Sequence, residues 1–132
     1  MAHTTTIDVR FAELDPYGHV NHAVYLTYFE VARTEALVAC GIPLQVMAER
    51  GFQLVVIALE VKFRSAANAG DRLVAETEVS ELRRASGVWS QRLLRADEVM
   101  VTAEVTAAVT DRSGKPTRPP EWLFPALEQL RS

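Results

Sequence analysis

Alternation of apolar and polar residues predicts five strands in this chain. In the stretch LEVKFR, Leu59, Val61 and Phe63 alternate with charged residues, a period of two that places one face of a strand in a core. A similar alternation begins at Ile7 and ends near Ala12. The remaining strands are predicted at 73–80, 88–95 and 99–109. Short polar links join the last four strands, and this spacing predicts an antiparallel meander.

Two segments have a helical pattern instead. No proline or glycine interrupts residues 22–40, Asn21 is a good N-cap, and Gly41 and Pro43 supply a stop. We expect one helix of about five turns there. Its apolar residues occupy more than one stripe, which is typical of a helix buried on most sides. A second, short helix is predicted at 121–131, where three leucines share one face.

The order of these elements predicts an α+β fold. One antiparallel sheet needs a cover on its apolar face, and the early helix is the only element long and apolar enough to provide it. We therefore expect a five-stranded sheet wrapped around a long central helix, with a short helix at the C-terminal end. Such a sheet leaves exposed edge strands, and pairing with a second copy removes them, so a homo-oligomer (dimer or tetramer) is expected.

Composition narrows the class of protein without identifying it. A chain of 132 residues with 48% hydrophobic and 23% charged residues is expected to form one globular domain, 1–132. The net charge is −3, and the basic residues form no cluster suited to binding nucleic acid. No apolar run is long enough to cross a membrane. The single cysteine, Cys40, and an N-terminus without a signal-peptide core favour a cytoplasmic location.

The most unusual segment is LDPYGHVNH, residues 14–22, which concentrates reactive and turn-forming residues directly before the long helix. Asp15 has two interpretations: a turn residue in Asp-Pro-Tyr-Gly, or a carboxylate that activates water or attacks a substrate. The first N–H groups of a helix have no partner within it and favour negative charge. His19 and His22 are three residues apart with no third ligand at a supporting spacing, so we expect no metal.

The segment FAELDPYGHVNHAVYLTYFEVAR, with this order of elements, resembles the hotdog-fold acyl-CoA thioesterases of the 4-hydroxybenzoyl-CoA thioesterase type. The resemblance extends over nearly the whole chain. It implies a hotdog fold and hydrolysis of acyl-CoA or acyl-carrier-protein thioesters without metal or organic cofactor, at sites between subunits. By the same match, Asp15 is the catalytic carboxylate, and the backbone N–H groups of His22 and Ala23 polarise the thioester carbonyl.

Residues around this motif are candidates for substrate binding. His19 and Asn21 lie beside Asp15 in the sequence, and Asn21 also caps the helix. Tyr25 is a core or interface residue that can line the acyl pocket. Arginine and lysine suit the phosphates of coenzyme A, and the candidates are Arg64, Arg83 and Arg84.

The sequence leaves several further points open. Glu13 is interpreted as a solvated carboxylate, and Arg33 as the partner either of Glu30 on the same helix or of a group across a dimer. The carboxylate mechanism, base or nucleophile, is undecided, as is the acyl group. The alternative functions are a hotdog hydratase or dehydratase, and a non-catalytic acyl-CoA binding module.

Overall fold

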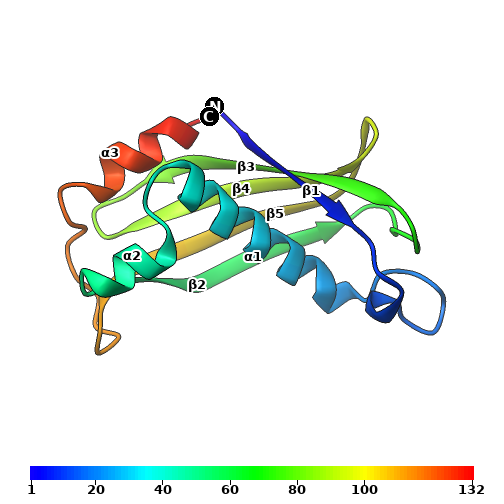
Figure 1. Cartoon of the computed structure of the whole chain (residues 1–132), viewed down its shortest axis with the longest axis horizontal. Helices are drawn as coiled ribbons and strands as arrows, with labels where there is room; N and C mark the ends of the chain where they lie inside the picture. Colours follow the sequence, from blue (N-terminus) through cyan, green and yellow to red (C-terminus); the bar gives the residue numbers. More distant parts are fainter.

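The computed structural model describes all 132 residues as one antiparallel sheet that curves around a helix (Figure 1). The strands have the order β1-β3-β4-β5-β2. Their bounds are β1 His3–Asp8, β2 Phe52–Phe63, β3 Arg72–Leu82, β4 Ser86–Arg95 and β5 Glu98–Asp111. The helices are α1 His22–Ala39, α2 Leu44–Glu49 and α3 Leu123–Leu127, with 3-10 turns at Phe11–Glu13 and Glu128–Leu130. The predicted α+β class is confirmed.

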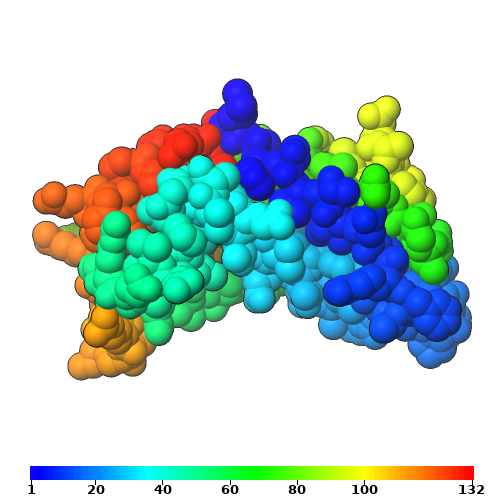
Figure 2. Space-filling view, in the orientation of Figure 1, coloured from blue at the N-terminus to red at the C-terminus, as the bar shows by residue number.

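The long helix α1 forms as the sequence predicts and crosses one face of the sheet (Figure 1). The side chain of Asn21 caps it, and Gly41 follows its end with φ +80°, a conformation that glycine adopts at little cost. The face toward the sheet is buried and includes Tyr25, Phe29 and Ala36. The opposite side is largely uncovered between β1 and α2, as Figure 2 shows. The prediction of burial on most sides is therefore correct for the sheet-facing half only.

The predicted meander is correct for β3, β4 and β5 but wrong for β2, which pairs with β5 at the far edge. The link 64–71 carries the chain from β2 past β5 and β4 to β3. Three strand spacings are about 14 Å, and an eight-residue link spans up to roughly 27 Å, so the crossing is sterically easy. Sequence pattern alone does not distinguish this crossover from a hairpin.

Strand β2 begins at Phe52, seven residues before the predicted start at Leu59. A β-bulge between Val56 and Ala58 changes the phase of the alternation, so that even-numbered residues before it and odd-numbered residues after it point toward α1. The groove-lining or core-packed residues on that face are Phe52, Leu54, Val56, Leu59, Val61 and Phe63. An alternation with one uninterrupted period of two therefore does not predict the first half of β2.

Three other boundaries differ from the predictions. Strand β1 ends at Asp8, because Phe11 begins a 3-10 turn that redirects the chain and leaves its own side chain 85% exposed. The predicted link 43–51 contains helix α2, which buries Met47 against the core. The C-terminal helix is only five residues long before it tightens into a 3-10 turn. The two chain ends meet, since the Met1 amino group donates to the Arg131 carbonyl at 2.8 Å.

Candidate active site

Asp15 lies in a tight loop that is closed by its own backbone. The Asp15 N–H donates to the His19 carbonyl at 2.6 Å, and Leu14 pairs with Val20 on either side of the turn. Gly18 supports the reversal with φ +79°. One carboxylate oxygen of Asp15, Oδ1, accepts hydrogen bonds from the N–H groups of Tyr17 at 2.9 Å and His19 at 3.1 Å. The turn interpretation of Asp15 is thus correct for Oδ1, whereas Oδ2 accepts no hydrogen bond from the protein and is available for chemistry.

The start of α1 presents one free backbone N–H beside this loop. The side-chain oxygen of Asn21 accepts from the Ala23 N–H at 2.9 Å, and the Asn21 carbonyl accepts from Val24. The His22 N–H donates no hydrogen bond within the chain. Of the two amides expected to polarise a carbonyl, the structure therefore leaves His22 available, whereas Ala23 is occupied by the cap. Asn21 serves the helix and does not line the cleft.

The start of the crossover link 64–71 also lines the site. The Val20 N–H donates to the Ala67 carbonyl at 2.8 Å, and the Ala67 N–H donates to the buried hydroxyl of Tyr25 at 2.9 Å. The Tyr25 ring also packs against Phe63, with ring centroids 5.7 Å apart. Tyr25 therefore holds this link against α1, a positioning role that its place in the sequence did not reveal.

These segments enclose an open cleft of about 280 Å³. Asp15, His19 and the start of α1 line it, together with Arg64 and the end of β2. Five of the residues predicted to form the site thus meet in one place: Asp15, His19, His22, Tyr25 and Arg64.

A partly buried network directly before the Asp15 loop was not predicted from the sequence. Glu13 accepts hydrogen bonds from Arg10 and, at 2.7 Å, from the Tyr28 hydroxyl. Its side chain is only 12% exposed, so the interpretation of Glu13 as a solvated carboxylate is wrong. Burial by itself raises the pKa of Glu13, but the hydrogen bonds from Arg10 and Tyr28 outweigh it and hold that pKa below 4.5. Burial and the bond to Glu13 raise the pKa of Tyr28, which stays neutral.

Arg83 and Arg84 lie far from the Asp15 of their own chain. Strand β3 begins beside β1 at Arg72 and runs for about 33 Å, at roughly 3.3 Å per residue, to the turn that carries the two arginines. There Arg83 forms an ion pair with Glu81 at 2.9 Å. Within one chain, this distance keeps both residues out of the cleft.

The structure contains no group of three or more histidine, cysteine, aspartate or glutamate side chains placed to hold a metal ion. None of its helices is both long enough and apolar enough to span a membrane.

A sheet curved around one helix, with a carboxylate on the loop that enters that helix, defines the hotdog class of enzymes, and comparison with known proteins agrees. Residues 9–127 match the family described as the thioesterase-like superfamily. The chain therefore belongs to that superfamily. A probable thioesterase from Bartonella henselae superposes on it with a TM-score of 0.87 at 32% identity, covering 91% of this chain and 100% of that one. The hotdog fold implied by the resemblance is confirmed.

Curated relatives have thioesterase names. Acyl-CoA thioesterase YbgC from Haemophilus influenzae is 35% identical over 95% of this chain and 93% of its own length. The long-chain acyl-CoA thioesterase FadM of Escherichia coli is 33% identical over 76% of this chain and 75% of its own length. An acyl-acyl carrier protein thioesterase, ATL2 of Arabidopsis thaliana, is 31% identical over 89% of this chain and 64% of its own length.

Proposed function

We propose that this protein is an acyl-CoA thioesterase that hydrolyses a thioester to a free acid and a thiol, with Asp15 as its catalytic carboxylate. One observation carries the assignment of the site. An unpartnered carboxylate oxygen of Asp15 and the free His22 N–H belong to residues that line one cleft. The names of relatives that align over nearly the whole chain support the reaction class.

Each group then has a proposed role. The thioester carbonyl oxygen accepts a hydrogen bond from the His22 N–H, where the dipole of α1 favours the developing negative charge. Asp15 Oδ2 either takes a proton from the attacking water or attacks the carbonyl carbon and forms an anhydride that water then cleaves. In both routes the carbon–sulfur bond breaks, an acyl–oxygen bond forms, and the thiolate receives the proton. A general base contributes about 100- to 10,000-fold and one oxyanion donor about 100- to 1,000-fold.

The active form is proposed to be a homodimer joined along β2. This edge strand is twelve residues long and exposes Val55, Ile57 and Leu59. An exposed, apolar edge of that length favours pairing with a second copy. A two-fold axis near the middle of β2 brings the start of the partner's β2 to the end of this one, beside the Asp15 cleft. In each chain the β3–β4 turn lies at the end of the sheet where β2 starts, so across the two-fold axis Arg83 and Arg84 can hold coenzyme A phosphates for the partner's site.

Arg64 is proposed to hold the phosphate-bearing side of the substrate within the same chain. It lines the same cleft as Asp15 and forms no ion pair with an acidic side chain, so its charge is available to an anionic ligand. We also propose that the protein works in the cytoplasm, which its lone cysteine favours.

Neither alternative function has comparable support. A hydratase of this fold needs a histidine with an acidic partner, and the side chains of His19 and His22 form no hydrogen bond with a carboxylate. A binding module needs no unpartnered carboxylate at the site.

The test is release of free thiol from a panel of aromatic and aliphatic acyl-CoAs, run beside Asp15→Asn and the control Asp97→Asn. Asp97 is an exposed turn residue that does not line the cleft. We expect a loss of at least about 100-fold in kcat for Asp15→Asn, with an unchanged circular dichroism spectrum, and no loss for the control. Equal rates for Asp15→Asn and the parent would refute the mechanism. The same panel on acyl-carrier-protein thioesters distinguishes the two carriers.

A further inference from the structure

A groove continues from the Asp15 cleft along the seam between α1 and β2. Two adjoining cavities of about 160 and 150 Å³ follow the cleft. Glu30, Arg33 and Val56 line both, so the two cavities are parts of one groove. Its first lining residue, Leu26, directly follows Tyr25 of the cleft on the same helix. An acyl group bound with its carbonyl at His22 has this seam as its path along the helix.

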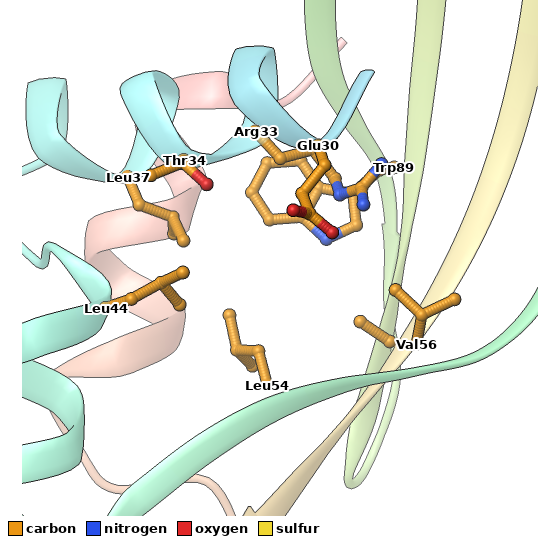
Figure 3. Close-up of a pocket in the computed structure, with 9 residues that line it drawn as sticks. Glu30, Arg33, Thr34, Leu37, Leu44, Leu54, Val56 and Trp89 are labelled. Carbon is orange, nitrogen blue, oxygen red and sulfur yellow. The ribbon is translucent and has the colours of Figure 1, made fainter. Parts of the chain in front are cut away.

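Two charged side chains project into this otherwise apolar groove. Figure 3 shows Glu30 and Arg33 pointing into the cavity in front of Trp89, across from Leu44 and Leu54. Arg33 is half-buried and makes a single hydrogen bond, from Nη1 to Gln91 Oε1 at 2.9 Å, which leaves most of its five donors unused. The Glu30 carboxylate is exposed and accepts no hydrogen bond from the chain. Apolar walls with a few convergent polar groups are the usual composition of a ligand pocket.

The neighbouring charges restrict the chemistry of a matching ligand. A ligand carboxylate is attracted by Arg33 and repelled by Glu30. A ligand ammonium is attracted by Glu30 and repelled by Arg33. A hydroxyl group can donate to Glu30 and accept from Arg33, so an uncharged hydroxyl satisfies both residues at once. A plain alkyl chain at the same place displaces water from both charged groups and forms no hydrogen bond with either of them.

The position of Glu30 on the helix sets the length of the acyl group. Glu30 is eight residues after His22, about 12 Å along the helix axis, and helical side chains lean back toward the N-terminus by several ångströms. An extended chain advances roughly 1.2 Å per bond, the value that a fully extended backbone implies. The hydroxyl is thus expected about six to ten bonds beyond the thioester carbon.

We propose that Glu30 and Arg33 make this enzyme selective for medium-chain acyl groups that carry a hydroxyl at their far end. The inference rests on the proposed thioesterase function and deepens it by naming the substrate class. Glu30 is the specificity-determining residue that can be tested, because Arg33 also supports Gln91 in the core.

The experiment compares octanoyl-CoA with 8-hydroxyoctanoyl-CoA in two ways: kcat/KM by thiol release, and Kd by calorimetry with the non-hydrolysable thioether forms of the same ligands. The variants are Glu30→Ala, the isosteric Glu30→Gln, and the control Glu35→Ala, an exposed glutamate on the same helix that lines none of these cavities. We expect the parent and Glu35→Ala to favour the hydroxylated ligand by about tenfold or more, because a site that hydrogen-bonds a hydroxyl discriminates against analogues without one. In Glu30→Ala the ratio between the hydroxylated and the plain ligand falls to about one, and in Glu30→Gln the ratio is intermediate.

The outcomes separate the two proposals. Hydrolysis of both substrates at equal efficiency, or an unchanged preference in Glu30→Ala, overturns the selectivity and leaves the thioesterase function intact. Preferential binding of the hydroxylated thioether without any hydrolysis overturns the thioesterase function and keeps the groove as a binding site. Absence of both binding and hydrolysis overturns both. Circular dichroism and thermal unfolding of Glu30→Gln establish that any change arises in a folded protein.

Discussion

The cleft at Asp15 and the groove along α1 and β2 adjoin each other but differ in how their polar groups are satisfied. Around the cleft, the side chains of Asn21, Tyr25 and Glu13 all have partners within the chain. In the groove, Glu30 has none and Arg33 has one, among exposed apolar residues of β2.

This difference indicates two tasks for one helix. A reaction needs groups held in place before the substrate arrives, and internal hydrogen bonds provide that rigidity. Recognition of a substrate or a partner subunit needs groups whose hydrogen bonds and apolar surface are still available. The first half of α1 is built for chemistry, and the groove beyond it is built to contact something outside the chain. Substitutions in the two regions are expected to have different effects.

Ile57→Lys is expected to abolish dimerisation. Ile57 is 61% exposed at the bulge of edge strand β2, so the folded chain tolerates the lysine, but a dimer joined there must bury two charges. Light scattering after size exclusion is expected to show a dimer for the parent and a monomer for the variant, with a large loss of thiol release. Thr6→Lys, on the other edge strand β1, serves as the matched control and should stay dimeric. A dimeric Ile57→Lys protein would exclude the β2 edge as the interface.

Tyr25→Phe is expected to loosen the wall of the cleft. The substitution removes the hydroxyl that accepts from the buried Ala67 N–H and leaves that donor unsatisfied, at a cost of about 1–3 kcal/mol. Urea unfolding should show this decrease in the free energy of unfolding, and kcat should fall because the link 64–71 is no longer held against α1. Tyr17→Phe, with a side chain 85% exposed, should change neither quantity. Unaltered stability of Tyr25→Phe would show that this hydrogen bond does not position the link.

Glu13→Gln is expected to produce the smallest effect, with a defined pH dependence. The folded-state pKa of Glu13 lies below its ordinary value of 4.5, because the hydrogen bonds from Arg10 and Tyr28 outweigh burial. Its carboxylate therefore stabilises the fold above about pH 4.5, and this contribution is lost as the pH falls through the folded-state pKa. We expect Glu13→Gln to lower the free energy of unfolding by roughly 1 kcal/mol at pH 7 and by less near pH 4.

The measurement for Glu13 is urea unfolding of parent and variant at both pH values. Glu121→Gln, an exposed glutamate without an ion pair, provides the baseline for loss of a surface charge. A difference in the free energy of unfolding between parent and variant that grows as the pH falls would contradict the prediction, because a carboxylate with a lowered pKa stabilises the fold less at lower pH.

Local sequence determined much of this molecule. The cap at Asn21 and the stop at Gly41 bound α1 to within a residue, because capping and left-handed turns depend on neighbouring residues alone. The alternation in β3 and in most of β5 correctly identified the faces that are buried. Asp15, His19 and His22 were candidates for the site because they lie within eight residues of each other, and the structure places them around one cleft.

Tertiary structure decided what depends on residues distant in the sequence. The pairing of β2 with β5, the link that closes the cleft, and the bond from the Ala67 N–H to Tyr25 all join segments separated by about 40 to 60 residues, for which no local pattern exists. The cap that occupies the Ala23 N–H, the network that buries Glu13 and the separation of Arg83 from Asp15 likewise required the folded chain. Periodicity specifies which side of an element is buried, whereas packing in three dimensions selects which polar groups keep a free hydrogen bond for a substrate.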